Sequence, residues 1–293
     1  MITVFTPTYN RAYILPQLFE SLLNQSNKDF EWLIVDDGST DNTNELVNKF
    51  ILKADFKISY LYQNNQGKHI AINTALDHIA TKYFVTVDSD DILLLNGIDL
   101  ITRNLCHIDE NEQIICLAFP HKQKSRDNYQ VNKEIPYTTI VSTPYEMLSK
   151  YGIFGEFSLV FLHHVHQKYK YPQFENEKFI KESVVYNRIF QIYKLIYFNF
   201  SIVESEYLND GLTSNFRNLL YNNPKGAALS HLEKTNTTSY NLVDRLNEME
   251  SYWDYESVFN KSFFNKLMKV KSTRLKFLFL KNRILKIFSK YIK

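Results

Sequence analysis

The sequence predicts an α/β fold, in which a mixed, mostly parallel sheet of Rossmann-like type is flanked by helices and followed by a helical extension. Short runs of β-branched and aromatic residues alternate with amphipathic helical patterns, as is typical of a parallel sheet with right-handed crossovers. Helical patterns alone continue after residue 223. The 293 residues are 44% hydrophobic, enough to bury a full core. We therefore expect a main domain over residues 1–222, with halves of about 1–115 and 116–222, and an extension over residues 223–293.

The first two strand–helix units are marked by the polar residues that end each strand. Residues 2–6 form an apolar run that stops at the polar loop 7–11, and a helical pattern follows over residues 14–23. Residues 31–35 form a second apolar run, which ends in the acidic turn 36–41 ahead of a second helical pattern. The repeat predicts two parallel strands joined by a helix.

Two further units follow, and the last of them ends in clustered acid. Residues 58–62 predict a third strand, with a helix over residues 70–79. Residues 83–87 predict a fourth strand, which stops at Asp88-Ser89-Asp90-Asp91. In open parallel α/β sheets, ligands bind outside the carboxyl ends of the strands. The polar residues after strands one, two and four should therefore line one pocket.

The carboxylates of Asp88, Asp90 and Asp91 suggest a cation site. Carboxylates this close repel one another unless a cation or hydrogen-bond donors neutralise them. Mg²⁺ and Mn²⁺ suit such ligands, because they bind one or two carboxylates and leave their other positions to water and phosphate oxygens. The alternative is that Asp88, Ser89 and Asp90 form a turn that caps the next helix. These residues by themselves leave both interpretations open.

Several classes of protein are disfavoured by motifs that the sequence lacks. There is no Gly-x-Gly-x-x-Gly motif after the first strand and no Gly-Lys-Ser/Thr phosphate loop, which argues against dinucleotide oxidoreductases and P-loop enzymes. Cys106 and Cys116 have no metal-ligand spacing, and neither a signal peptide nor a membrane-spanning run is evident. We therefore expect a cytoplasmic protein in a reducing compartment.

Four motifs stand in order at the predicted strand ends, at residues 7–11, 35–41, 67–73 and 87–91. In order and spacing they resemble the inverting family 2 glycosyltransferases of GT-A fold. Residues 174–182 and 207–213 are further similar to a bacterial subgroup that builds surface polysaccharides, so the resemblance covers roughly residues 1–225. Four ordered motifs are a stronger signal than any one of them.

The resemblance implies roles for individual residues. The loop from Pro7 to Tyr9 would line the base and ribose pocket, and Asp37 would accept a hydrogen bond from the base. Asp88 would face the ribose or a metal, and Asp90 would bind the Mn²⁺ or Mg²⁺ ion that bridges the diphosphate. Such an ion stabilises the charge that develops on a leaving nucleoside diphosphate. The full set of nucleotide-sugar residues is Pro7, Thr8, Tyr9, Arg11, Asp37, Lys68, Asp88, Ser89 and Asp90.

The middle of the chain carries fewer signals. Residues 116–144 look irregular and polar, and we expect a variable loop or hairpin beside the acceptor. A predicted strand over residues 154–162 is followed by His163-His164-Val165-His166. Because neighbouring strand residues point to opposite faces, we expect structural or surface histidines and no zinc site. Glu156, in this strand, is an acceptor-side candidate.

The candidate catalytic base lies in a second acidic cluster. An inverting transfer needs a base that takes the proton of the acceptor hydroxyl. Related enzymes carry an Asp or Glu at the start of a helix and an Arg six positions later, and Glu182 with Arg188 fits that spacing. The family pattern Glu-Asp is replaced by Glu182-Ser183, so Glu177 and Glu175 stay open as alternatives. Glu182 could instead cap its helix.

These features predict a metal-dependent inverting glycosyltransferase that uses a UDP-sugar. Its acceptor would be a glycan or lipid-linked oligosaccharide in the synthesis of capsule, O-antigen or another bacterial surface polysaccharide. Two alternatives are a nucleotidyltransferase and a non-catalytic nucleotide-binding module. The first would show a glycine-rich basic loop after strand one, which residues 6–9 lack. The second would lack one of four carboxylates that are all present, namely Asp37, Asp88, Asp90 and Glu182.

The C-terminal tail differs in charge from the rest of the chain. Residues 261–293 contain eleven Lys or Arg and no Asp or Glu, although the whole chain has a net charge of only +2. On a helical wheel, Lys281 is the one basic residue among an apolar side of Phe277, Leu280, Ile284, Leu285, Ile287, Phe288, Tyr291 and Ile292. The opposite side is basic, with Lys276, Arg283, Lys286, Lys290 and Lys293.

This pattern predicts a helix that binds peripherally to an anionic membrane, at the inner face of the cell membrane. The alternative is that its apolar side packs on the catalytic domain or on a second subunit of a homodimer. Nucleic acid is not expected as a partner, because the rest of the chain is acidic.

Overall fold

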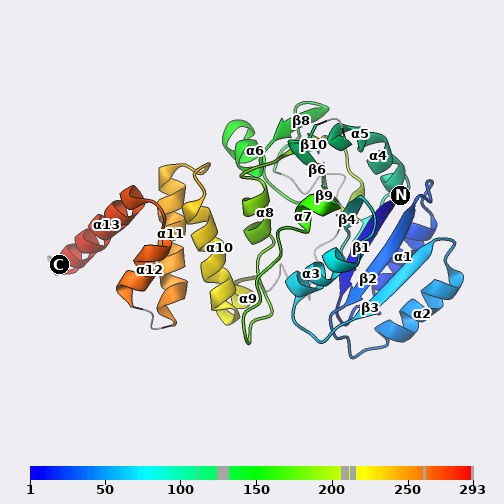
Figure 1. The fold of residues 1–293 in the computed structure, drawn as a ribbon, viewed down its shortest axis with the longest axis horizontal. Helices are drawn as coiled ribbons and strands as arrows, with labels where there is room; N and C mark the ends of the chain where they lie inside the picture. The colour runs from blue at the N-terminus through cyan, green and yellow to red at the C-terminus, as the bar shows by residue number, and fades with distance from the viewer. Residues whose placement is uncertain (110, 124–131, 206–210, 212–215, 260–261, 292–293) are drawn as a thin grey trace. The chain divides into compact units, whose positions relative to one another are not determined.

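The computed structural model describes residues 1–109, 111–123, 132–205, 211, 216–259 and 262–291. The chain forms two compact units (Figure 1), the first made of Met1–Tyr171 and Ile192–Ser214 and the second of Pro172–Gln191 and Asn215–Lys293. The predicted α/β fold with a helical C-terminal region is confirmed. Within the described ranges, no helix is long and apolar enough to cross a membrane.

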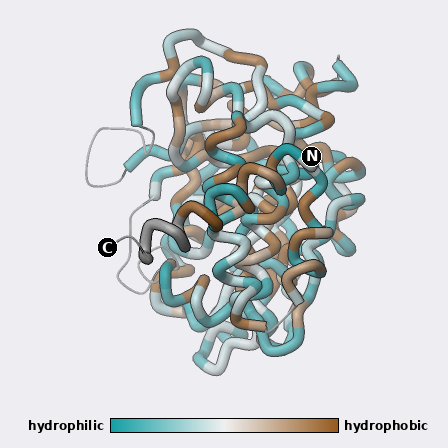
Figure 2. Tube along the Cα trace, turned by 90° about the vertical axis from the view of Figure 1, so that its left-hand side faces the viewer, coloured by the Kyte–Doolittle hydropathy of each residue, from teal (hydrophilic) through white to brown (hydrophobic). Residues whose placement is uncertain are grey.

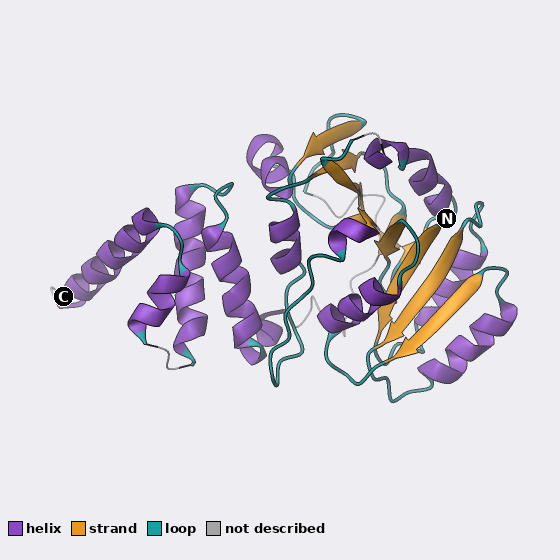
Figure 3. Cartoon of the chain, viewed as in Figure 1, coloured by secondary structure: helices purple, strands orange, loops and turns teal. Residues whose placement is uncertain are grey.

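An eight-stranded mixed sheet forms the centre of the first unit (Figure 3). Its strand order is β3-β2-β1-β4-β9-β6-β10-β8. The strands span Ile2–Thr8 (β1), Phe30–Asp36 (β2), Lys57–Tyr62 (β3), Tyr83–Thr86 (β4), Ile114–Pro120 (β6), Thr139–Ser142 (β8), Phe157–Leu162 (β9) and Lys194–Phe198 (β10). The first four strands are parallel, whereas β9 runs antiparallel to both of its neighbours. A small second sheet contains β5 (Ile92–Leu93), β7 (Lys122–Gln123) and β11 (Val203–Ser205).

Helices cover the sheet of the first unit. They are α1 (Leu15–Leu23), α2 (Thr43–Lys53), α3 (Lys68–His78), α4 (Gly97–Asn104), α5 (Cys106–Asp109), α6 (Pro144–Tyr151) and α7 (His163–His166). Strands β1 and β2 are buried along their whole length, as expected for a sheet covered on both faces. Phe19 of α1 stacks on Phe50 of α2 with ring centroids 4.0 Å apart, and Trp32 of β2 lies 6.2 Å from Phe19. This aromatic cluster fixes β2, at whose end Asp36 and Asp37 stand.

The expectation that residues 116–144 begin as a loop was wrong. Residues 116–120 belong to β6, which lies between β9 and β10 and is buried along its whole length. The run Ile114–Pro120 is apolar on both faces, as an interior strand requires, and the polar stretch begins only after it. Residues 124–131 of the predicted loop lie outside the described residues.

The three neighbouring histidines lie on the short helix α7. His166 is buried and meets the rings of Phe84 and Phe161 edge-on, with centroids 5.5 and 4.6 Å away. His163 Nε2 lies 2.8 Å from the carbonyl oxygen of Leu76. Both side chains pack within the first unit, as the sequence predicted, although they lie on a helix and not on the strand that the prediction assumed.

The second unit is helical. Its helices are α8 (Ser183–Ile189), α9 (Phe216–Asn222), α10 (Pro224–Asn236), α11 (Leu242–Ser257), α12 (Phe263–Lys269) and α13 (Thr273–Tyr291). Residues of α10, α11 and α13 form its core together with Val270, and the largest of them are Met249, Tyr252, Trp253 and Phe279. Hydrophobic and hydrophilic residues alternate along α13 (Figure 2).

The division between the units differs from the predicted boundary at residue 222. Residues 172–191, which we expected in the main domain, group with the C-terminal helices because polar contacts hold them to α10. Both carboxylate oxygens of Glu177 accept backbone N–H groups at the start of α10, each at 2.8 Å. Arg188 of α8 donates through Nε to Glu233 Oε1 at 2.9 Å.

Candidate functional site

The carboxyl ends of β1, β2, β4 and β6 lie at one edge of the main sheet, because these strands are parallel to one another. Strand β9 runs in the opposite direction and therefore begins at the same edge. Pro7 and Thr8 end β1, Asp37 follows β2, and the acidic run 88–91 follows β4. Glu156 stands just before β9. The structure thus places the predicted nucleotide-sugar residues of these loops along one edge.

Asp37 is buried and organises the loop after β3. Its Oδ1 accepts hydrogen bonds from Gln63 Nε2 at 2.7 Å and from the Gln66 N–H at 2.9 Å, and its Oδ2 accepts the Gly67 N–H at 2.7 Å. Gly67 has a φ of +96°, which favours glycine, and Lys68 follows it as the first residue of α3. A carboxylate has about four acceptor positions, so after these three bonds Asp37 keeps room for one from a ligand.

Asn10 links the loops after β1 and β2. It has a φ of 52°, its Oδ1 accepts the Thr40 N–H at 2.7 Å, and its own N–H donates to Ser39 Oγ at 2.8 Å. Tyr9, next to it, is 47% exposed. The loop is therefore held in place while the ring of Tyr9 stays accessible.

Lys68 and Asp88 form an ion pair at the end of β4, with Nζ 2.7 Å from Oδ2. The other carboxylate oxygen, Asp88 Oδ1, is buried and has no hydrogen-bond partner in the described part of the chain. The same holds for Thr8 Oγ1 on the neighbouring strand β1. A buried polar atom without a partner is costly. The two unpaired atoms therefore suggest that a bound ligand completes their hydrogen bonds or coordination.

The acidic residues after Asp88 repel one another. Burial, and then the charge of Asp88, raises the pKa of Asp90, and the charges of Arg11 and Lys68 oppose this shift. Asp91 is buried, and its pKa is raised further by burial and by the charges of Asp88 and Asp90. A bound cation would relieve this repulsion. Ser89 is buried between them.

These residues fit a divalent cation that is shared between the protein and a ligand. Among the residues that the structure describes, no group of three or more His, Cys, Asp or Glu side chains is arranged to hold a metal by itself. Mg²⁺ at phosphate sites commonly takes only one or two carboxylates and completes its shell with phosphate oxygens and water. Asp88 Oδ1 and Asp90 can supply that number of donors.

His121 stands at this edge and was not predicted from the sequence. It follows β6, its Nδ1 lies 3.0 Å from Ser205 Oγ, and its N–H donates to the Glu156 carbonyl at 3.0 Å. Burial lowers the pKa of His121 to about 4, and the nearby charge of Asp88 opposes the shift. The residue is thus a neutral imidazole close to Asp88. The apolar run 114–120 could have indicated His121. It is followed directly by this histidine, just as the predicted fourth strand is followed by Asp88.

The candidate base and two acceptor-side candidates belong to the second unit. Glu182 immediately precedes α8, makes no side-chain hydrogen bond to the first turn, and accepts from the Tyr186 hydroxyl at 3.3 Å through Oε2. Glu177 is buried and holds the start of α10 with both oxygens. Arg188 is paired with Glu233. Glu177 is therefore committed to holding the fold, whereas Glu182 stands at the start of a helix, as the sequence predicted.

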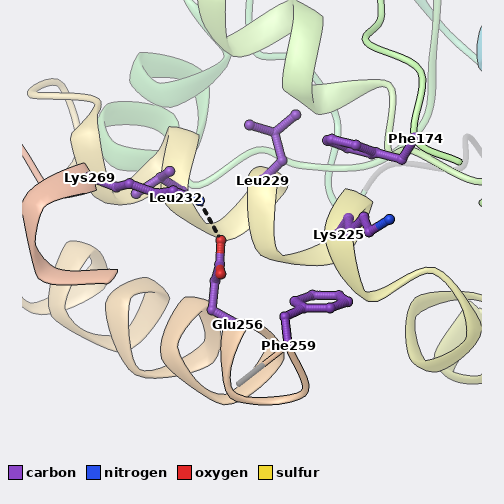
Figure 4. Close-up of a pocket in the computed structure, with 7 residues that line it drawn as sticks. All are labelled: Phe174, Lys225, Leu229, Leu232, Glu256, Phe259 and Lys269. Carbon is purple, nitrogen blue, oxygen red and sulfur yellow. Dashed lines mark hydrogen bonds and ion pairs between the residues drawn. The ribbon is translucent and has the colours of Figure 1, made fainter. Parts of the chain in front are cut away.

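A cavity lies inside the second unit (Figure 4). It is lined by Phe174, Lys225, Leu229, Leu232, Glu256, Phe259 and Lys269. The lining is mostly apolar, and the ion pair between Lys269 Nζ and Glu256 Oε1, 2.7 Å long, stands at its wall. No predicted nucleotide-sugar residue contributes to it.

Known proteins are similar to this chain in sequence. The model of the family described as "Glycosyl transferase family 2" matches residues 3–170. An uncharacterized glycosyltransferase of Rickettsia conorii is 35% identical over 128 residues, which is 44% of this chain. The match spans only 20% of the length of that relative.

Two solved structures share the fold. S. aureus TarS 1–349 in complex with UDP-GlcNAc has a TM-score of 0.61 at 16% identity, covering 94% of this chain and 82% of that chain. The mannosyltransferase PcManGT of Pyrobaculum calidifontis, in complex with GDP-Man and Mn²⁺, has a TM-score of 0.51 at 14% identity. That alignment covers 99% of this chain and 81% of the other. At such identities the likeness concerns the fold alone.

Proposed function

Because the chain belongs to the family 2 glycosyltransferases and has a GT-A fold, we propose that it transfers one sugar from a nucleotide diphosphate sugar to an acceptor hydroxyl with inversion. The observation that carries this proposal is the end of β4. There Lys68 pairs with Asp88, while Asp88 Oδ1 and Thr8 Oγ1 are buried without partners. A uridine nucleotide is the first candidate, because the similar TarS structure binds UDP-GlcNAc.

The donor would lie along the edge of the sheet. The accessible ring of Tyr9 stacks on the base, and the remaining acceptor position of Asp37 takes a ring N–H. Lys68 and Arg11 bring positive charge toward the diphosphate. Asp88 and Asp90 would hold Mn²⁺ or Mg²⁺, which would supply Lewis-acid stabilisation of the leaving diphosphate. The Mn²⁺ in the similar PcManGT structure supports this choice of ion.

Glu182 is proposed as the general base. The acceptor oxygen attacks the anomeric carbon from the face opposite the diphosphate, the bond from that carbon to the diphosphate oxygen breaks, and the hydroxyl proton passes to the Glu182 carboxylate. The Tyr186 hydroxyl, 3.3 Å from Oε2, orients this carboxylate. A single displacement of this kind inverts the configuration of the sugar.

The acceptor is proposed to be a glycan or a lipid-linked oligosaccharide in the synthesis of a bacterial surface polysaccharide, such as capsule or O-antigen. This rests on the resemblance of residues 174–182 and 207–213 to a bacterial subgroup. Of the second motif, residues 207–210 and 212–213 lie outside the described residues.

Calorimetric titration of UDP with and without Mn²⁺ tests the donor site. Asp90→Asn should abolish Mn²⁺-dependent binding and transfer, and Asp88→Asn should weaken both, because each removes a carboxylate that would bind the ion. Asp99→Asn on α4 is the matched control, since its carboxylate pairs with Arg103 of the same helix. Unchanged Mn²⁺-dependent affinity in Asp90→Asn would exclude the metal role.

Product formation from a panel of nucleotide sugars tests the transfer itself. The wild-type protein should consume one donor of the panel when an acceptor glycan and Mn²⁺ are supplied. A protein that binds UDP and Mn²⁺ but consumes no donor, even by slow hydrolysis, would favour a non-catalytic nucleotide-binding module.

A further inference from the structure

One side of α13 holds this helix to α11. Leu275 and Phe279 are fully buried, and the ring of Phe279 lies 4.9 Å from that of Trp253. On the same side, Arg283 Nη2 lies 3.0 Å from Glu250 Oε2 and 3.3 Å from Asp254 Oδ1. The positions 275, 279 and 283 are four apart and so share one helix face. An arginine from the basic side of the wheel thus packs inward with two apolar residues.

The opposite side of α13 is exposed and apolar. Phe277, Ile284 and Leu285 are 68%, 51% and 55% exposed. Arg274 and Lys281, also exposed, fall on the same side, because the positions 274, 277, 281 and 284 follow helical spacing. We call these five residues the outer face of α13. Neither Leu275 nor Phe279 was among the apolar residues of the predicted face, and of that face Phe277, Ile284 and Leu285 stay exposed.

Positive charge remains unpaired around the outer face. Of the basic residues in α12 and α13, Lys266 stands over the Trp253 ring, Lys269 pairs with Glu256, and Arg283 pairs with two acids of α11. Three others of α13 have no carboxylate partner among the described residues, namely Arg274, Lys276 and Lys281. The same holds for Lys271, which lies between the two helices. Three acids of α11, namely Glu250, Asp254 and Glu256, are thus paired with Arg283 or Lys269. The remaining positive charge lies in and beside the outer face.

We propose that the outer face of α13 binds the surface of an anionic membrane. Exposed apolar side chains enter the headgroup boundary of a bilayer, while Lys and Arg beside them attract anionic lipid phosphates. A second copy of the chain fits less well. A two-fold interface sets the same patch against itself, and it would bring Arg274 and Lys281 of both copies together without an acid to neutralise them.

This inference goes beyond the proposed transfer and does not depend on it, because membrane binding is measured without donor or acceptor. The two are nevertheless compatible. A lipid-linked acceptor is confined to a bilayer, so an enzyme held at that surface would meet it at a higher local concentration.

Co-sedimentation of the full chain with vesicles tests the proposal. The protein should pellet with vesicles that contain phosphatidylglycerol at low salt, and should stay in the supernatant with phosphatidylcholine alone or at high salt. The double variant Phe277→Ser/Ile284→Ser and the double variant Arg274→Glu/Lys281→Glu should each lower vesicle affinity by about tenfold or more. Val243→Ser is the matched control, because Val243 is 68% exposed on α11 of the same unit.

Two results would overturn the proposal. One is that the full-length protein does not co-sediment with phosphatidylglycerol vesicles at low salt. The other is a dimer in solution, seen by light scattering, that Phe277→Ser/Ile284→Ser converts to monomer, since the outer face would then be covered by a second copy. Thermal melting and UDP binding establish that each variant is folded, and both should match the wild type because the substituted side chains are exposed.

Discussion

The carboxylates of Glu182 and Glu177 have different surroundings, because Glu177 holds the start of α10 with both oxygens and Glu182 precedes α8 without capping it. Glu182→Gln should keep donor binding and lower turnover by roughly 10²–10⁴-fold, because glutamine preserves size and hydrogen bonding but cannot take the hydroxyl proton. Steady-state kinetics, together with UDP calorimetry on the same preparation, separate the two effects. Near-normal turnover would contradict the assignment and move the role to Glu177 or Glu175.

Glu177→Gln is the companion variant. An amide has one acceptor oxygen where the carboxylate of Glu177 has two, so one of the N–H groups of Lys225 and Gly226 would lose its partner. The free energy of unfolding should fall by about 1–3 kcal/mol, as measured by urea denaturation. Turnover per folded molecule should stay close to that of the wild type if Glu182 is the base.

At the scale of elements, the contact between α10 and the segment before α8 depends on a glycine. A Cβ at Gly226 would lie 2.6 Å from the Phe179 carbonyl oxygen and 3.1 Å from Ile180 Cγ1. Gly226→Ala should therefore push α10 away from this segment and destabilise the second unit by about 1–3 kcal/mol. Denaturation followed by fluorescence reports on that unit when it is measured in a Trp32→Phe background, because Trp253 is then the one tryptophan of the sequence. UDP binding is the control for the first unit. Unchanged stability would mean that the backbone at residue 179 can shift to make room for the Cβ atom.

The elements that the sequence predicted well were those whose signals are local. Runs such as residues 31–35 and 83–87 contain both the apolar pattern of a buried strand and the polar residues that end it, and they were found in the structure as β2 and β4. Strand β6 was missed because the polar residues that follow it were taken to begin at Cys116, and His121 was missed with it. The pattern of a buried strand carries no alternation that would mark its ends.

The division of the chain into units could not be predicted, because it depends on partners that are distant in sequence. Glu177 binds the N–H of Gly226, and Arg188 binds Glu233, across intervals of 49 and 45 residues. In the sequence Glu177 is one of three similar glutamates. Only the folded chain shows that Glu177 is the one that holds the start of α10.

At the scale of the whole molecule, three buried histidines predict a loss of stability in acid. Burial lowers the pKa of His69, His121 and His166 to about 4 from a usual value of 6.5. Between these values the unfolded chain binds protons that the folded chain does not, so stability should fall as the pH drops from about 6.5 toward 4. Each pKa unit corresponds to about 1.4 kcal/mol. Thermal melts at a series of pH values would measure the fall.

His69→Leu isolates this effect from that of other groups. Both ring nitrogens of His69 are buried without a hydrogen-bond partner in the described part of the chain, so leucine removes a titrating group and no hydrogen bond. The variant should show a shallower loss of stability with falling pH than the wild type. Asp90 and Asp91, whose raised pKa values act in the opposite direction, are the same in both proteins. Identical pH profiles would show that His69 does not contribute.

The second unit takes residues 172–191 from the middle of the chain, and this ties its assembly to the order of synthesis. When these residues leave a ribosome, α10 has not yet emerged, although Ile180 and α8 pack against it. At roughly 5–20 residues per second, the nascent segment waits a few seconds for residues up to 236. During that interval its apolar side chains are open to chaperones and proteases. The speed of translation through residues 192–236 therefore sets how long the segment that carries Glu182 stays unprotected.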